Sequence, residues 1–450
     1  MKMSGYFITG ATGFVGGALT LQILGRTNDP VVCLVRGTDS NPEARLEQTL
    51  RKAAAAYKYP PGFIDVNRSR IHVAPGDLNE STELIKPAGV RISEFWHGAA
   101  SLRFGNKDHA EIFSTNVNGT RQAMKLAQRV GAEVFNHVST AYVAGRRTGP
   151  IEECHVLSDV ETNNLYERSK IDAECLVAAA SDIRTRIWRP SIVVGHSETL
   201  AATSFSGMYG MMKEIIRFKK VVRNTLGSFL ETHSLKMLAD PDSTLNFIPV
   251  DYVVGQAVEL SLAGIEEDVV HLTNELSPTV GRCFELFFDE LGIRRPTYVT
   301  SREHLSSLDA RFGKKLAFYG SYLSGAKQFR QRAGIKHGRV LSFAFDDQTL
   351  LRHLRWYLRY LGVDSAADET VKMRAGNPSL ALPGEEAIYG VVARSLMAKA
   401  PTQMPGACGW PDRKKDDFEA EEQLCHVTTG ARLTRRSCGL RRPWSQLGTK

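Results

Sequence analysis

Several features that define other classes of protein are scarce in this sequence of 450 residues. Its seven cysteines are scattered and form no Cys-x-x-Cys pair, so neither a disulfide framework nor a zinc site is expected. No stretch approaches about 18 consecutive apolar residues, which argues against a transmembrane helix. The first strand is expected to begin near Gly5, which leaves no room for a cleavable signal. We therefore expect a cytoplasmic protein in a reducing compartment, without a metal.

The positive charge is also limited, at a net +8, and it is unevenly distributed. Six basic residues and no acidic residue occur between Thr428 and the end of the chain. We therefore do not interpret the charge as a sign of nucleic-acid binding. The tail over residues 366–450 is expected to be largely disordered, because proline, glycine, charges and isolated cysteines occur in it without periodicity. No pattern indicates an oligomeric state.

Short apolar runs alternate with helical patterns in the first half of the sequence. Strands are expected at Tyr6–Ile8, Val31–Val35, Ile71–Ala74, Glu94–His97, Val134–Val138 and Thr185–Trp188. Helices are expected between them, at Phe14–Leu24, Ala44–Tyr57 and Val117–Val130. This alternation implies parallel strands with right-handed crossovers, and so an α/β fold with a doubly wound parallel sheet.

The domain organisation follows from where this alternation weakens. We expect a nucleotide-binding Rossmann domain over residues 1–265, with interleaved substrate segments at about 196–245. Residues 266–365 are expected to form a smaller, α-rich C-terminal substrate-binding region. Late strands are expected at Asn246–Val250 and Val269–Leu272, and late helices at Phe284–Leu291 and Leu350–Leu361.

A glycine-rich turn carries the strongest functional signal. It follows the first strand and opens a helix, and it reads Thr9-Gly10-Ala11-Thr12-Gly13-Phe14-Val15-Gly16. Gly10 permits the tight turn, Gly13 lets the backbone approach a pyrophosphate, and Gly16 lets the helix pack closely on the sheet. The free N–H groups of the helix start then bind the phosphates. The context, a strand before the turn and a helix after it, predicts a dinucleotide site.

Residues after the next strands indicate which dinucleotide binds. Arg36 follows the second strand, where an NAD site usually has an acidic residue, and its guanidinium suits a 2′-phosphate. NADP(H) is therefore favoured, with a surface arginine as the alternative. Asp77 and Leu78 follow the third strand, where Asp77 could hold the adenine amine or serve as a turn residue. Ala99 follows the fourth strand and leaves room for the cofactor.

The candidate catalytic residues are Thr140, Tyr166 and Lys170. Tyr166 and Lys170 lie four residues apart, on one face of a helix, and Lys170 can also bind the cofactor by holding its nicotinamide ribose. A lysine ammonium beside the phenol is expected to lower the tyrosine pKa, so that Tyr166 acts as the general acid. Thr140, with Ser139 as the alternate, follows a strand and can donate to a substrate carbonyl oxygen. His97 and His137 are interpreted as satisfied core histidines.

These motifs together resemble one group, the thioester-reductase and fatty acyl-CoA reductase branch of the extended short-chain dehydrogenase/reductases, known as the male sterility NAD-binding family. The matching segments are the glycine turn, Cys33–Arg36, Asn116–Thr120, His137–Val143, Tyr166–Lys170, Trp188–Gly195 and Asn246–Val253. The resemblance covers about residues 4–265, and more loosely to about 365. It implies that NADPH delivers hydride to an acyl thioester on coenzyme A or an acyl-carrier protein, which gives an aldehyde and in some members an alcohol.

By position in the motifs, the resemblance assigns catalysis to Thr140, Tyr166 and Lys170 and cofactor contacts to Gly10, Gly13, Gly16 and Arg36. Two alternatives to this function stay open at this point. The first is another extended oxidoreductase or an epimerase, acting on a ketone, a hydroxyl group or a sugar nucleotide. The second is a cofactor sensor without activity, against which the intact catalytic residues argue.

The helical segment Met208–Val222 also allows two interpretations. Its apolar members are Met211, Met212, Ile215, Phe218 and Val222, and its basic members are Lys213, Arg217, Lys219, Lys220 and Arg223. It is interpreted as an ordinary amphipathic helix, or else as a lid whose cations meet the phosphates of a thioester cofactor. Peripheral membrane contact through this segment is left open.

Overall fold

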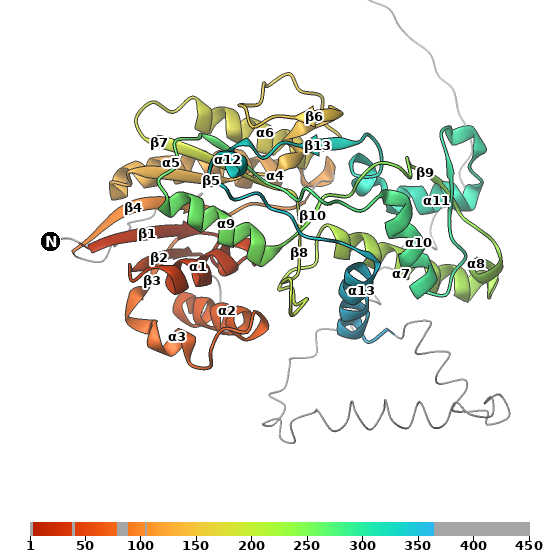
Figure 1. The fold of residues 1–450 in the computed structure, drawn as a ribbon, viewed down its shortest axis with the longest axis horizontal. Coiled ribbons are helices and arrows are strands. Elements are labelled where there is room, and N and C mark those ends of the chain that lie inside the picture. The colour runs from red at the N-terminus through yellow and green to blue at the C-terminus, as the bar shows by residue number, and fades with distance from the viewer. Residues whose placement is uncertain (1–2, 38–40, 79–88, 104–105, 364–450) are drawn as a thin grey trace, which may run out of the picture. The chain divides into compact units, whose positions relative to one another are not determined.

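A seven-stranded parallel sheet lies at the centre of the protein (Figure 1). The computed structural model describes residues 3–37, 41–78, 89–103 and 106–363. The strand order is β11-β7-β5-β4-β1-β2-β3. These strands are β1 (Met3–Thr9), β2 (Val31–Val35), β3 (Ile71–Pro75), β4 (Val90–His97), β5 (Val134–Val138), β7 (Arg184–Pro190) and β11 (Val269–Leu272). The chain runs outward from β1 first in one direction and then, from β4, in the other, so the expected doubly wound sheet is confirmed.

Helices cover both faces of the sheet because side chains of neighbouring strand residues point to opposite faces. Tyr6 and Ile8 pack with α1 (Phe14–Arg26), α2 (Pro42–Ala56) and α9 (Val250–Leu262). Phe7, between them in the sequence, packs on the other face with α5 (Gly119–Val130) and α6 (Leu165–Ala178). Continuous apolar strands such as β2 are buried on both faces, as parallel sheets require.

The remaining elements surround one end of the sheet or connect its strands. The connecting elements are α3 (Phe63–Val66), η1 (Arg68–Arg70), η2 (Asn106–Asp108), α4 (His109–Phe113), the π-helical turn η3 (Ser114–Asn118), η4 (Ala141–Ala144), β6 (Gly149–Ile151) and β8 (Ile192–Val194). The later elements are α7 (Met208–Leu226), α8 (Phe229–Thr232), β9 (Lys236–Leu238), β10 (Phe247–Pro249), α10 (Val280–Glu290), β12 (Thr297–Val299), η5 (Arg302–His304), α11 (Ser307–Lys315), η6 (Ala317–Ser321), β13 (Lys327–Phe329), α12 (Arg332–Lys336) and α13 (Asp347–Leu361).

Two features of the sheet differ from the expectation. The strand expected at Asn246–Val250 is present as β10, but it pairs with β8 in a separate two-stranded sheet. Conversely, β11 joins the main sheet beside β7, although it lies after residue 265. The sheet therefore extends beyond the expected end of the Rossmann domain. Contacts divide the chain into units Met1–Gly376 and Asn377–Lys450, and the tail expected to be disordered lies outside the described residues.

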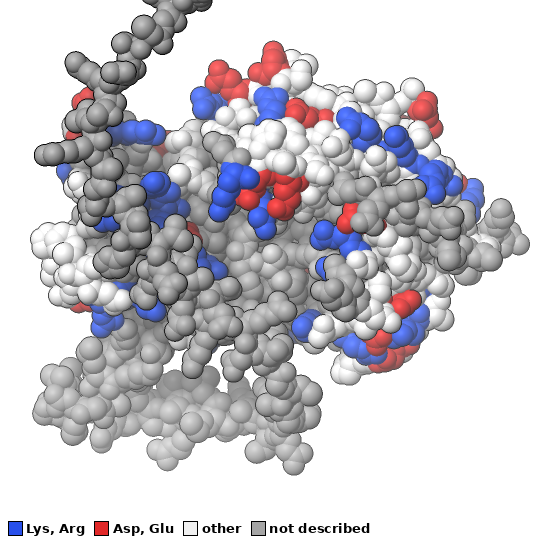
Figure 2. All heavy atoms as spheres, turned by 180° about the vertical axis from the view of Figure 1, so that it is seen from behind, with Lys and Arg blue, Asp and Glu red and all other residues white. Residues whose placement is uncertain are grey.

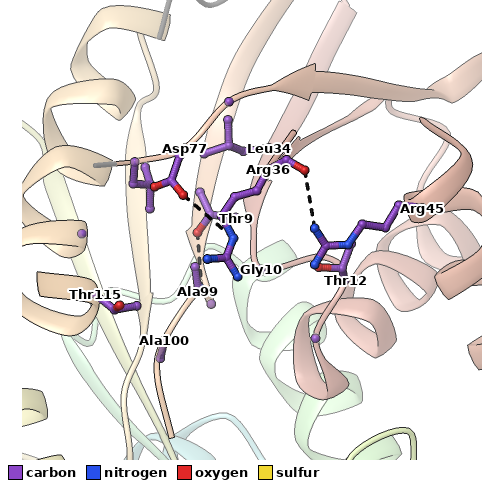
Figure 3. A pocket seen from close by; sticks show the side chains of 15 residues that line it. Thr9, Gly10, Thr12, Leu34, Arg36, Arg45, Asp77, Ala99, Ala100 and Thr115 are labelled. Carbon is purple, nitrogen blue, oxygen red and sulfur yellow. Dashed lines mark hydrogen bonds and ion pairs between the residues drawn. The ribbon is translucent and has the colours of Figure 1, made fainter. Parts of the chain in front are cut away.

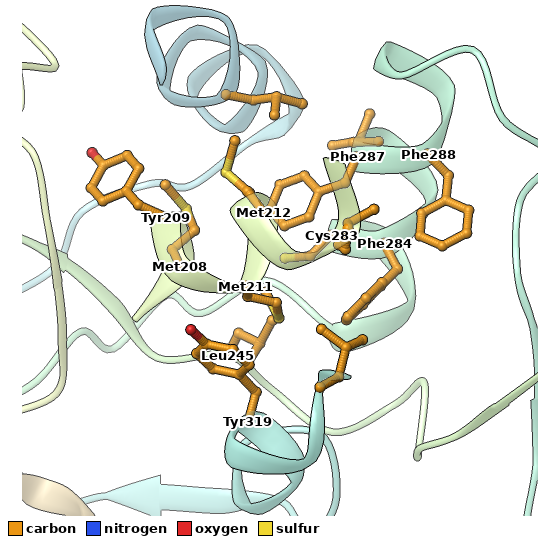
Figure 4. Packing of buried hydrophobic residues seen from close by; sticks show 14 of the residues in the cluster. Met208, Tyr209, Met211, Met212, Leu245, Cys283, Phe284, Phe287, Phe288 and Tyr319 are labelled. Carbon is orange, nitrogen blue, oxygen red and sulfur yellow. The ribbon is translucent and has the colours of Figure 1, made fainter. Parts of the chain in front are cut away.

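A second hydrophobic core forms where α7 packs against α10 and η6 (Figure 4). Met211 and Met212 of α7 lie among Cys283, Phe284 and Phe287 of α10. The apolar residues that the helical pattern of Met208–Val222 predicted to share one face are all buried in α7, namely Met211, Met212, Ile215, Phe218 and Val222. The interpretation as an amphipathic helix on a core is therefore confirmed, and nothing in this packing tests the lid.

The described surface carries charges of both signs, and Figure 2 shows Lys and Arg interspersed with Asp and Glu over one face. In the described ranges, no helix combines the length and the apolar character that crossing a membrane requires. No group of three or more potential metal ligands occurs among the same residues.

Candidate active site

The glycine turn is built by close backbone packing. Gly10 has φ +79°, and a Cβ on it would lie 2.6 Å from the backbone nitrogen of Ala99. A Cβ on Gly16 would lie 2.1 Å from the carbonyl oxygen of Gly10. Gly13 is the N-cap of α1 and provides no side-chain cap, so the first N–H groups of the helix have no side-chain acceptor there. The turn therefore offers a bare helix N-terminus of the kind that binds phosphate groups.

A cavity of about 230 Å³ adjoins one side of this turn (Figure 3). This cavity is lined by five predicted cofactor contacts other than glycines, namely Thr12, Arg36, Asp77, Leu78 and Ala99. Nε of Arg36 lies 4.0 Å from a carboxylate oxygen of Asp77, and the Arg36 side chain is 65% exposed.

Arg45 of α2 also lines this cavity and was missed by the sequence analysis. Its guanidinium lies 3.5 Å from the carbonyl oxygen of Arg36, so two guanidinium groups border the same cavity (Figure 3). No motif marks Arg45, and only the fold of α2 against the second strand reveals it.

A larger cavity of about 630 Å³ adjoins the other side of the turn. It is lined by the start of α1, including Phe14, Val15 and Gly16, and by Thr140, Tyr166 and Lys170. The two cavities share Gly10, Thr12 and Gly13. The structure thus brings the three predicted catalytic residues together in one cavity, next to the glycine turn.

Lys170 is held beneath the cavity by the end of β5. Its Nζ donates to the carbonyl oxygen of Val138 at 2.8 Å and lies 3.4 Å from Nε2 of His137. Lys170 is only 2% exposed, and burial lowers its pKa to about 8, although the carboxylate of Glu174 opposes this shift. The amine is therefore mostly protonated at neutral pH and loses its proton at a lower pH than an exposed lysine does.

The expected effect of Lys170 on Tyr166 is wrong for this structure. Burial raises the pKa of Tyr166 above its ordinary value, and the neighbouring Glu167 carboxylate adds to the increase. The ammonium does not lower it, because the Lys170 side chain is directed to the backbone of Val138 instead. Tyr166 is therefore a protonated phenol at neutral pH, which is the form that a general acid requires.

Among the hydroxyl groups that line the same cavity, those of Thr140, Ser139 and Ser191 follow strands of the main sheet. Thr140 Oγ1 accepts from the backbone N–H of Tyr142 at 3.2 Å, which leaves its own proton available for donation. The buried hydroxyls of Ser139 and Ser191 have no hydrogen-bond partner among the described residues. Ser191 was not predicted, although it lies within a segment that carried the resemblance. A buried polar group without a partner is costly, so these hydroxyls are suited to meet a ligand.

The two core histidines are buried as predicted, but only one is satisfied. His97 lies 2.7 Å from the hydroxyl of Thr9 and 3.1 Å from that of Thr120, and burial lowers its pKa to about 3. Nδ1 of His137 has no partner among the described residues, so the prediction that this histidine is satisfied is wrong. Burial and the Lys170 charge hold the pKa of His137 well below its usual value.

A buried ion pair joins α6 to β7. Glu174 of α6 accepts from the guanidinium of Arg189 at 3.0 and 2.6 Å, and both side chains are 1% exposed. Glu174 lies one turn after Lys170, and Arg189 is followed directly by Pro190 and Ser191 of the cavity wall. The pair therefore ties the helix that carries Tyr166 to the strand on the opposite side of the cavity.

These features define a class of protein, a dinucleotide-binding Rossmann protein with hydroxyl, tyrosine and lysine side chains at the ends of its strands. The model of the male sterility protein family, an NAD-binding domain, matches residues 8–257. Because this match spans more than half of the 450 residues, the chain belongs to that family. The resemblance inferred from the sequence motifs is confirmed.

Relatives in this family differ in size and source. The chain is 26% identical over 284 residues to the glycine betaine reductase ATRR of Emericella nidulans, which covers 59% of this chain and 20% of that protein. It is 25% identical over 289 residues to the fatty acyl-CoA reductase wat of Drosophila melanogaster, which covers 56% of this chain and 53% of that protein. The chain thus spans about half, or much less, of the length of these relatives.

Among solved structures, the terminal R domain from the myxalamid PKS-NRPS biosynthetic pathway has a similar fold. It superposes with a TM-score of 0.61 at 23% sequence identity and covers 80% of this chain and 92% of that domain. At this identity the similarity concerns the fold alone.

Proposed function

We propose that this protein uses NADPH to reduce an acyl thioester, carried by coenzyme A or an acyl-carrier protein, to the aldehyde, with reduction to the alcohol as a second step to be tested. One observation carries the proposal. Thr140, Tyr166 and Lys170 line one cavity with the glycine turn, so a proton donor and a dinucleotide site lie side by side. Relatives named as a glycine betaine reductase and a fatty acyl-CoA reductase support the assignment to reductases.

The residues fit a nicotinamide dinucleotide. The backbone at Gly10 and Gly16 leaves no room for a Cβ, and the bare start of α1 suits a pyrophosphate. Arg36 and Arg45 border the smaller cavity, where two guanidinium groups suit a 2′-phosphate and therefore favour NADPH over NADH. When bound, the cofactor supplies the hydride that reduces the substrate carbon.

The protein's own groups then handle the oxygen and the proton. Thr140, with Ser139 as the alternate, donates to the thioester carbonyl oxygen and positions the carbon for attack. As the carbonyl oxygen gains negative charge, Tyr166 gives it the phenolic proton. The resulting hemithioacetal loses the thiol and forms the aldehyde. Lys170, whose pKa is about 8, lies on the same face of α6. Its ammonium stabilises the negative charge on the substrate oxygen, which solvent does not reach in this buried site.

The direct test is NADPH oxidation with a panel of medium- and long-chain acyl thioesters, in parallel with ketones and sugar nucleotides. Reduction to the aldehyde predicts one free thiol for each NADPH consumed, and reduction to the alcohol predicts one free thiol for every two NADPH. Product analysis then separates aldehyde from alcohol. Turnover of a ketone or a sugar nucleotide without thiol release would replace this proposal with a ketone reductase or an epimerase.

A further inference from the structure

Aromatic side chains continue from the wall of the larger cavity to the protein surface. Phe205 lines the cavity, and its ring centroid lies 4.5 Å from that of Tyr360 and 6.2 Å from that of Trp356 on α13. Trp356 and Tyr360 stack on each other with an interplanar angle of 16°, and Tyr360 is 44% exposed. An aromatic surface therefore starts at the substrate cavity and ends in solvent.

Basic side chains border this aromatic surface on two helices. Lys213 and Arg217 follow Tyr209 at four-residue intervals on α7, and the Tyr209 ring lies 6.2 Å from Trp356. Arg352 and Arg359 lie one turn before and after Trp356 on α13. Both α13 arginines and both α7 cations are exposed.

Each guanidinium of this group has five N–H donors, so a bond within the protein leaves other donors for an anionic ligand. Arg217 bonds Glu214 at 3.0 Å, and Arg352 donates to the carbonyl oxygen of Glu198 at 3.3 Å. The rings of Tyr209 on α7 and Tyr357 on α13 lie 5.0 Å apart, so the two helices pack side by side. The two helices therefore present their positive charge to the same aromatic surface.

We propose that this aromatic–basic strip (Phe205, Lys213, Arg217, Arg352, Trp356, Arg359 and Tyr360) binds the 3′-phosphoadenosine diphosphate of a coenzyme A thioester. Adenine stacks on exposed aromatic rings, and a stacked base contributes about 1–3 kcal/mol. The guanidinium groups pair with the phosphates. A phosphopantetheine on a carrier protein has a phosphate but no adenine, so the exposed rings favour coenzyme A. The inference rests on the proposed function and names the carrier of its substrate.

The test compares one acyl group attached to coenzyme A with the same group attached to pantetheine, which has no nucleotide. The strip predicts a kcat/KM for the acyl-CoA about tenfold or more above that for the acyl-pantetheine, mostly through KM. Trp356→Ala and Arg359→Glu should remove this advantage and leave turnover of the acyl-pantetheine unchanged. Lys125→Glu, on the exposed side of α5, is the matched charge control and should change neither rate.

The outcomes separate the inference from the proposed function. Equal kcat/KM for both thioesters in the unaltered protein would overturn the strip but leave thioester reduction intact. If Trp356→Ala and Arg359→Glu lose activity toward a carrier-protein thioester but keep their acyl-CoA turnover, the strip does not bind the nucleotide. That result would overturn the inference and indicate that the strip docks a carrier protein. If neither of these thioesters nor a carrier-protein thioester is reduced, the proposed function fails, and calorimetric titration with 3′-phosphoadenosine 5′-diphosphate tests the strip directly. Binding that Arg359→Glu abolishes would support the strip, and no binding would overturn it.

Discussion

Replacing Lys170 with methionine tests the buried amine beneath the active site. Burial lowers the pKa of Lys170 from its ordinary value of 10.5 to about 8. Below pH 8 the amine is charged in both the folded and the unfolded state. Between about pH 8 and pH 10.5 only the unfolded state holds the proton, so the free energy of unfolding should rise with pH in this range. Lys170→Met has no amine to titrate and should lose this part of the increase.

The magnitude follows from the two pKa values. Integrated from about pH 7 to about pH 9.5, the difference in bound protons corresponds to about 2 kcal/mol of additional stability for the unaltered protein. Other groups that titrate in this range, including surface lysines, are common to both proteins and cancel in the comparison. At neutral pH, Lys170→Met removes the burial penalty but leaves the carbonyl oxygen of Val138 without its donor, so these effects oppose each other.

The assay is urea unfolding of both proteins at the two pH values, without cofactor. The account predicts that the gain in unfolding free energy is about 2 kcal/mol larger for the unaltered protein than for Lys170→Met. An equal gain in both proteins would mean that the pKa of Lys170 is not lowered by burial, and the reasoning about this site would be refuted.

Three further substitutions test the cofactor site and its support. Arg36→Glu should weaken NADPH binding by about 10- to 100-fold and NADH binding far less, and equal losses in fluorescence titrations would remove the 2′-phosphate contact. Gly16→Ala should lower unfolding free energy by about 2 kcal/mol or more, because its Cβ meets a backbone oxygen at 2.1 Å; unchanged urea midpoints would contradict this packing. Glu174→Gln should cost about 3–5 kcal/mol by leaving Arg189 buried without its partner, whereas Glu161→Gln, in an exposed pair, should cost less than about 1 kcal/mol.

The fold was largely predictable because the sheet is parallel and buried. The strand expected at Val31–Val35 is a continuous apolar run, and its bounds agree with β2. The bounds expected at Val134–Val138 likewise agree with β5. The placement of β10 was not predictable, because a short apolar run does not reveal which strand it pairs with. The π-helical turn before α5 was also missed, since helical periodicity does not distinguish the type of turn.

The site was predictable where it depends on local sequence motifs, and not where it depends on side chains from distant segments. Thr140, Tyr166 and Lys170 follow from motifs, and the structure brings them to one cavity. Arg45 and the aromatic residues of the C-terminal region reach the cavities only through tertiary packing. The pKa of Tyr166 was predicted in the wrong direction, because burial and the direction of the Lys170 side chain are properties of the fold.

The most direct test of the central claim is single-turnover hydride transfer by Tyr166→Phe, measured as NADPH fluorescence decay and thiol release from an acyl thioester. The substitution keeps the aromatic ring and removes the phenolic hydroxyl with its proton, so NADPH should bind with nearly unchanged affinity while both signals fall by about 100-fold or more. Thiol release at the rate of the unaltered protein would contradict the assignment of Tyr166 as the proton donor.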